Sequence, residues 1–164
     1  MAKRIGATLI VLAGFLAAAE PARADITFLV GLHTPSAPNP TLGASIGRGK
    51  GVIGWEVELA SSGKQTATRA SAGCFCWNLI IQPPLRVGAA DVYFIGGFGL
   101  YGEVGGNALS TGPSIAADVG AGLKIPMSRG LKLRLDYRAF LGQASENDRA
   151  IHSQRLAAGL SLVF

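Results

Sequence analysis

The segment LKLRLDYRAFL, from Leu131 to Leu141, alternates between apolar and polar residues at almost every position. Successive side chains of a β-strand point to opposite faces, so this period of two predicts a strand. The pattern fits two environments: a soluble sheet with its leucines in a core, or a membrane barrel with its leucines in lipid. The choice between these environments decides the class of protein.

The composition argues against an ordinary soluble domain. Of 164 residues, 49% are hydrophobic, 15% are charged and 23 are glycine, and the mean hydropathy is +0.35. Soluble domains have about 25% charged residues. The length suits a single domain that needs neither disulfides nor a metal to fold. The formal net charge of +5 is too small to predict a nucleic-acid partner.

Residues 1–24 have the organisation of a cleavable secretory signal peptide. Lys3 and Arg4 give a basic start, residues 5–19 form an apolar run, and Ala22-Arg23-Ala24 is a small-x-small cleavage site. The apolar run is shorter than the ~20 residues that a membrane-spanning helix needs. Cleavage after Ala24 would leave one domain of residues 25–164. It would also lower the net charge from +5 to +3, because three basic residues and one acidic residue are removed.

Eight segments of strand length follow, separated by turn-forming residues. The predicted strands are residues 26–34, 41–48, 52–60, 72–82, 91–103, 114–125, 131–141 and 151–164. An even number of strands in sequence order predicts an all-β, antiparallel up-and-down barrel whose first and last strands pair. The connections after the second and sixth strands are tight, whereas those after the third, fifth and seventh are longer and more polar. Outer-membrane barrels show this asymmetry, with short periplasmic turns and longer external loops.

The face opposite the bulky apolar side chains decides between lipid and a soluble core. In the second strand this face consists of Gly43, Ser45 and Gly47. A soluble sheet would carry larger polar residues on its solvated face. Small residues inside and bulky apolar residues outside fit the narrow lumen of an eight-stranded transmembrane barrel. The segment 91–103 has no polar face, so the sequence does not fix which of its side chains point inward.

The charged residues of the strands would then point into the lumen. These residues are Glu56, Glu58, Asp118, Lys124, Lys132, Arg134, Asp136, Arg138 and Arg155. An uncompensated charge in a low-dielectric interior is costly, whereas charges of both signs compensate one another. We therefore predict a lumenal salt-bridge network. A proton or ion path, or a hydrolytic site, is the functional alternative, although no obvious nucleophile accompanies these residues.

The chain ends in RLAAGLSLVF, where Leu160, Leu162 and the terminal Phe164 alternate. This ending resembles the C-terminal signature of bacterial outer-membrane barrels, in which the barrel assembly machinery recognises the final aromatic residue. Residues 25–164 as a whole resemble the small barrels of the OmpA transmembrane-domain, OmpX and opacity-protein type. The resemblance implies an integral outer-membrane protein with outer-membrane lipids and lipopolysaccharide as partners. It implies no cofactor.

Two residue pairs raise other chemistry. Cys74 and Cys76 lie two apart on a predicted strand, at the far limit for a disulfide, and two cysteines alone make a poor zinc site. We interpret them as small lumenal side chains or as a strained vicinal pair. His152 and Ser153 suggest a lipid A deacylase, but neighbours in a strand face opposite sides. His33 is interpreted as a strand-end residue near a loop.

The expected function is that of a non-enzymatic outer-membrane barrel with a structural or surface-interaction role. Lys64 and Arg69, in the second external loop, are candidates for contact with lipopolysaccharide phosphates. A continuous pore is not expected, because side chains fill an eight-stranded barrel. Two alternatives stay open: an outer-membrane hydrolase acting on lipid A or phospholipid, and a secreted, soluble, lipocalin-like ligand carrier. The sequence predicts no particular oligomeric state.

Overall fold

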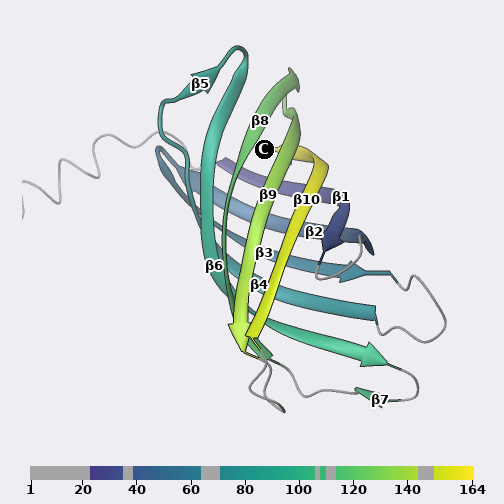
Figure 1. Ribbon diagram of the computed structural model, residues 1–164. Helices are drawn as coiled ribbons and strands as arrows, with labels where there is room; N and C mark the ends of the chain where they lie inside the picture. Colours follow the sequence, from purple (N-terminus) through teal and green to yellow (C-terminus); the bar gives the residue numbers. More distant parts are fainter. Residues whose placement is uncertain (1–22, 35–38, 64–70, 106–107, 110–113, 144–149) are drawn as a thin grey trace, which may run out of the picture.

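The computed structural model describes residues 23–34, 39–63, 71–105, 108–109, 114–143 and 150–164. The eight long strands are β1 (Arg23–Thr34), β2 (Asn39–Lys50), β3 (Ile53–Ser62), β4 (Ser71–Ile81), β6 (Ala90–Gly105), β8 (Ser114–Ser128), β9 (Leu131–Gln143) and β10 (Ala150–Val163). Each pairs antiparallel with its neighbours in sequence, and β1 also pairs with β10, so the sheet closes into a barrel (Figure 1). The predicted all-β, eight-stranded, up-and-down architecture is confirmed. No helix in the described ranges is long and apolar enough to cross a membrane.

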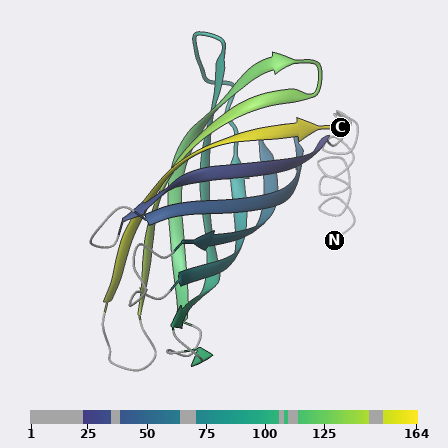
Figure 2. The same ribbon diagram turned by 90° about the vertical axis from the view of Figure 1, so that its right-hand side faces the viewer.

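Two short strands accompany the barrel and are not predicted by the sequence. β5 (Arg86–Val87) pairs with the first residues of β6, and β7 (Ala108–Leu109) pairs with its last residues. β5 lies in the connection from β4, just beyond Pro83 and Pro84, which have no N–H group to continue the ladder. The hairpin of β5 and β6 projects beyond the ends of β1–β4 (Figures 1 and 2).

The two ends of the barrel differ in their connections. At one end, called here the turn end, the chain reverses at residues 51–52, 88–89 and 129–130. Gly51, Gly88 and Gly130 have φ values of 60°, 62° and 81°, a left-handed conformation that glycine adopts without steric cost. β10 ends beside the start of β1 at this end (Figure 2), where Ala24 and Phe164 exchange two backbone hydrogen bonds of 3.0 and 2.9 Å. The opposite end, where β1, β3 and β9 finish, is called the loop end.

Most strand boundaries differ from the prediction by one to three residues, and two of these differences have a structural consequence. β8 continues to Ser128 instead of ending at Ile125, because a register shift between Pro126 and Ser128 accommodates the proline. β1 begins at Arg23, so the predicted cleavage position after Ala24 lies inside this strand. Residues 1–22 of the predicted signal peptide lie outside the described residues, and cleavage stays a prediction.

Side-chain exposure alternates along the strands and fixes their orientation. In β9, Leu135 and Tyr137 are exposed, whereas Arg134 and Asp136 are buried. The bulky apolar face of β9 is therefore the outer face of the barrel, and its charged face is the lumenal one. The same orientation holds for the small residues that the sequence assigned to the lumen, since Ser45 of β2 is 5% exposed.

The outer surface of the barrel is apolar. β6, whose orientation the sequence left open, directs Phe94 and Phe98 outward and Tyr93 inward. Among the outward positions of the long strands whose side chains are described, only Arg48 and Lys50 are charged, and both precede the turn at residues 51–52. Soluble monomers rarely expose contiguous apolar surface beyond a few hundred Å². The exterior fits lipid tails and argues against a soluble ligand carrier.

Glycines on the inner face provide the space that large lumenal side chains occupy. Gly122 lies beside Tyr93 in the pairing of β6 with β8, and Gly120 lies beside Arg138 in the pairing of β8 with β9. A Cβ atom on Gly122 would collide with the Tyr93 ring, and one on Gly120 would lie 2.9 Å from Arg138 Cγ. The alternation of small and large residues is therefore a packing requirement of the narrow lumen.

We expect Gly122→Ala to destabilise the barrel by about 1–3 kcal/mol, the usual cost of overpacking. Gly96→Ala is the matched control, because its added Cβ would lie 3.6 Å from the backbone oxygen of Asp118, an ordinary van der Waals contact. Urea unfolding in lipid vesicles, followed by tryptophan fluorescence, measures both variants. Equal unfolding midpoints would contradict this account of the packing.

Candidate functional site

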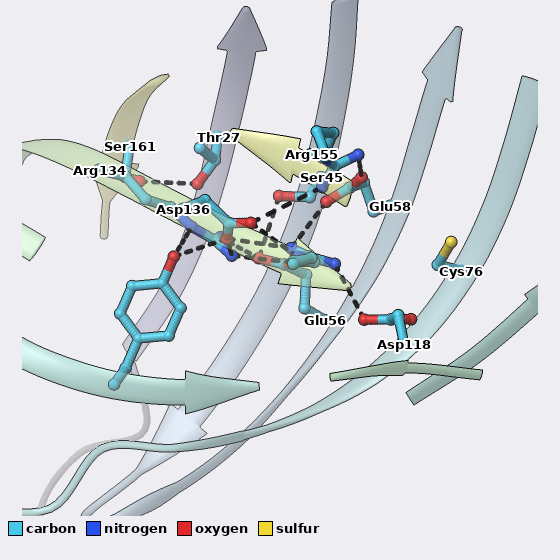
Figure 3. Close-up of polar contacts among 12 residues, drawn as sticks. Thr27, Ser45, Glu56, Glu58, Cys76, Asp118, Arg134, Asp136, Arg155 and Ser161 are labelled. Atoms are coloured by element: carbon cyan, nitrogen blue, oxygen red, sulfur yellow. Dashed lines mark hydrogen bonds and ion pairs between the residues drawn. The ribbon is translucent and has the colours of Figure 1, made fainter. Parts of the chain in front are cut away.

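A network of buried ion pairs crosses the middle of the lumen (Figure 3). Its members come from β3, β8, β9 and β10, and they are Glu56, Glu58, Asp118, Arg134, Asp136, Arg138 and Arg155. None of these seven residues is more than 4% exposed. They meet because each occupies an inward position of its strand and the barrel brings those positions to one axis.

Arg138 lies at the centre of the network. Its guanidinium nitrogens lie 3.1 Å from Glu56, 2.9 Å from Glu58 and 2.8 Å from Asp136. Asp118 lies 3.6 Å away. A guanidinium has five N–H donors in a planar fork, so one arginine can serve several carboxylates at once. Arg138 thereby links β9 with β3 and β8.

Arg134 binds the carboxylates of Glu56 and Asp136 and the phenol of Tyr93. Its two terminal nitrogens pair with the two oxygens of Glu56, and one of them also donates to Asp136 at 2.9 Å. The Tyr93 hydroxyl accepts a hydrogen bond from Arg134 Nε at 2.7 Å and donates one to Asp136 at 2.6 Å. Ser45 donates to Glu56 at 3.1 Å. The neutral side chains of Tyr93 and Ser45 therefore add to the hydrogen bonding of Arg134, Asp136 and Glu56.

The remaining members extend the network towards the loop end. Arg155 pairs with Glu58 and lies 3.8 Å from Asp136. Asn78 of β4, with its amide nitrogen facing Asp118, donates to that carboxylate at 3.0 Å and accepts from Arg138 at 2.8 Å. The sequence did not indicate Tyr93 or Asn78 as members. Asn78 lies on the same face of its strand as Cys74 and Cys76, and Tyr93 lies on the same face as Asp91. These positions, with the hydrogen-bonding groups of both side chains, are the signals that could have found them.

Two of the nine predicted network residues lie elsewhere. Lys124 pairs with Asp25 at 3.0 Å, and Lys132 lies 3.6 Å from Asp91, both nearer the turn end. The expectation of one network containing all nine residues is therefore corrected. The central group has four carboxylates and three guanidiniums, for a formal charge of −1, and its charges compensate one another almost completely.

A second polar chain lies on the lumenal side nearer the loop end. His33 Nε2 lies 2.8 Å from Ser153 Oγ, and His33 Nδ1 lies 3.5 Å from Ser62 Oγ. Ser62 in turn lies 2.9 Å from Thr41. Ser153 is buried and His152 is exposed, in agreement with the prediction that they face opposite sides. His33 is a strand-end residue, as interpreted, one position before β1 ends at Thr34, and it is also the partner of Ser153.

Cys74 and Cys76 are free thiols on the inner face of β4. Cys76 is fully buried, and its sulfur lies 3.1 Å from the hydroxyl of Tyr101. Their position matches the interpretation as small lumenal side chains rather than a strained pair. Within the described part of the chain, no group of three or more His, Cys, Asp or Glu residues could hold a metal ion.

The other predicted functional residues lie at the surface or outside the described residues. Leu160 and Leu162 are exposed on the outer face of β10, and Phe164, which follows this strand, is 70% exposed. Their role as an assembly signal stays a prediction. Lys64 and Arg69 lie outside the described residues.

Solved structures share this fold, although no family model and no curated protein matches the sequence. Neisserial surface protein A (NspA) superposes with a TM-score of 0.68 at 16% identity, over 89% of this chain and 99% of that chain. The N-terminal β-barrel domain of Pseudomonas aeruginosa OprF gives 0.67 at 12% identity, over 87% and 97%. The outer membrane enzyme PagL gives 0.53 at 13% identity, over 84% and 98%.

The chain has the fold of the small bacterial outer-membrane β-barrels. Together with the apolar exterior, this fold supports an integral position in the bacterial outer membrane. At sequence identities this low, a shared fold does not indicate a shared activity. One of the proteins with this fold, PagL, is an enzyme. The function must therefore be argued from the lumen and the surface of this chain.

We expect Arg138→Met to destabilise the barrel by about 3–5 kcal/mol, because it leaves buried carboxylates without their shared partner. Arg86→Met is the matched control. Arg86 pairs with Asp91 at 2.9 Å, but its side chain is 74% exposed, and exposed pairs contribute about 0–1 kcal/mol. Urea unfolding in vesicles measures both variants. A variant at position 138 that is as stable as the one at position 86 would show that the network does not hold the barrel together.

Proposed function

We propose that the chain is a non-enzymatic outer-membrane barrel with a structural or surface-interaction role. The observation that carries this proposal is the filled centre of the lumen, where seven charged side chains are at most 4% exposed and bind one another. A group so fully paired across four strands stabilises the wall of the barrel. Most of its carboxylate and guanidinium atoms are bound within the network, and the buried atoms of these seven side chains that lack a hydrogen-bond partner are Glu58 Oε2, Arg155 Nε and Arg155 Nη2.

The orientation of the barrel in the membrane follows from the different connections at its two ends. Outer-membrane barrels place short turns in the periplasm and longer loops outside. The turn end of this chain would then face the periplasm, and the loop end would face the cell surface. On this basis we propose that Lys64 and Arg69 contact phosphate groups of lipopolysaccharide, since charge-assisted hydrogen bonds to phosphate are strong. Leu160, Leu162 and Phe164 would be recognised by the barrel assembly machinery.

The purified protein should pass no steady ionic current after insertion into a planar lipid bilayer. The reason is that the ion-pair network fills the lumen and an eight-stranded barrel has no spare width beside it. A larger porin in the same membrane serves as the positive control. Stable conductance steps from the wild-type protein would contradict the closed lumen and favour an ion path.

An outer-membrane hydrolase acting on lipid A or phospholipid is the second candidate function. It is favoured by the 2.8 Å contact between His33 Nε2 and Ser153 Oγ, a distance typical of a base and its nucleophile. The group on the other side of His33 is the hydroxyl of Ser62, however, and not a carboxylate. The cavity beside His33 measures about 20 Å³, room for about one water molecule. A lipid chain does not fit there, so the non-enzymatic role comes first.

A fluorophosphonate probe for active serines should therefore leave the wild-type protein unlabelled, because His33 beside Ser153 contacts a hydroxyl and not a carboxylate, and the cavity has no space for the reagent. Gel fluorescence after incubation of the folded protein measures the labelling. Ser161→Ala, which removes another buried lumenal hydroxyl, is the matched control for Ser153→Ala. Labelling that is lost in Ser153→Ala and kept in Ser161→Ala would establish the hydrolase instead.

A further inference from the structure

The lumen is filled at its centre but hollow at the turn end. A cavity of about 670 Å³ lies there, between the ion-pair network and the turns, and it opens outward. We call it the turn-end basin, and its charged lining residues other than Arg23 are Asp25, Arg48, Arg86, Asp91, Lys124 and Lys132. Pockets of about 300–1,000 Å³ hold small organic ligands. The proposed function leaves this space without a role.

The charges around the basin are predominantly basic. Arg86, Lys124 and Lys132 accompany the two carboxylates, an excess of one positive charge. Arg48, at an outward position of β2, also lines the basin and raises the excess to two. Arg23 also lines the basin but is not needed for this balance. Cleavage after Ala24 would remove Arg23 and create an α-ammonium group on Asp25 in its place. The basin therefore attracts anions whether or not the predicted cleavage occurs.

The two carboxylates use only part of the donor capacity of these cations. Lys124 donates to Asp25 at 3.0 Å, and Arg86 donates to Asp91 through Nε at 2.9 Å. The terminal nitrogens of the Arg86 guanidinium lie outside that pair. Lys132 lies 3.6 Å from Asp91, which is beyond hydrogen-bond distance, so this pairing leaves the donors of its ammonium available.

The lining also includes apolar and uncharged groups. Ile80, Pro83 and Pro84 form part of the wall, on the side where β4 ends. A ligand that fills this basin would combine an anionic group, placed near Lys132 and Arg86, with a small uncharged part against this wall. Phosphate suits the anionic role, because it offers several acceptor oxygens to guanidinium and ammonium groups.

We propose that the turn-end basin binds the phosphate ester of a small organic alcohol through Lys132 and Arg86. The ester comes either from a phospholipid head group or from a free compound, and the chemistry of recognition is the same. The side of the membrane on which binding occurs rests on the proposed orientation of the barrel. The binding itself does not rest on the proposed function.

The test is a calorimetric titration of the purified barrel, in neutral detergent at low salt, with glycerol 3-phosphate. Glycerol is the uncharged control. We expect saturable binding that weakens as salt is added. The double variant Lys132→Gln and Arg86→Gln should weaken binding by about tenfold or more, as expected for the loss of charge-assisted hydrogen bonds. Lys132→Arg, which keeps the charge, should retain binding.

The matched control is the double variant Lys50→Gln and Arg129→Gln. It removes the same charge from the same end of the barrel, but neither residue lines the basin. Its affinity should stay within about twofold of the wild type, since both charges belong to exposed side chains outside the lining and contribute little. Heat-modifiable migration on gels shows that each variant is folded.

A parallel titration with lysophosphatidylglycerol distinguishes the two sources of the ester. Binding of glycerol 3-phosphate, alone or together with the lipid, supports a free ester as the ligand. Binding of the lipid alone supports a head group. The proposal is overturned if neither ligand binds, or if the control variant weakens binding as much as the basin variant does. Failure of this binding proposal would not contradict the closed lumen. A steady ionic current in the planar-bilayer experiment would contradict the proposed function but not the binding proposal.

Discussion

The pairing of Arg138 with carboxylates from other walls of the barrel is the interaction on which the rest depends. Glu58 belongs to β3, which is not adjacent to β9 in the sheet, so this ion pair crosses the lumen and requires a closed barrel. The barrel in turn requires the pair, because a guanidinium in this interior without a counter-charge is costly. The same period-two alternation that places Arg138 inside places Leu135 and Tyr137 in lipid.

How much of the fold could be predicted depended on the contrast between the two faces of each strand. β9 was predicted closely because its faces differ in both size and charge. In β6 both faces are apolar or aromatic between Asp91 and Glu103, which lie near its ends. The inward direction of Tyr93 is explained by its bonds to Arg134 and Asp136 on another strand. β5 has two residues, which is too short for any periodicity. The bulge at Pro126 depends on how β8 meets β9, which alternation alone does not determine.

The sequence predicted a network of ion pairs in the lumen, but not which of its residues contact one another. Alternation gives the face of a residue but not its height along the barrel axis, so Lys124 and Lys132 could not be separated from the central network. Height depends on the register of all the strands together. The contact of His33 with Ser153 was missed for the same reason: it is created where the first strand meets the last, and sequence reasoning considered only the neighbouring His152.

The position of the network divides the lumen into unequal parts. Between the network and the loop end, His33, Ser62 and Ser153 bind one another around a space of about 20 Å³. Between the network and the turn end there is a basin of about 670 Å³. Among the described residues, the ion-pair network separates these two spaces, so the proposed ligand of the basin would enter and leave at the turn end. An influence of that ligand on the loop end through the lumen would have to pass through the carboxylates that Arg138 holds. Their side chains are at most 4% exposed, so solvent would compensate a displaced charge only weakly.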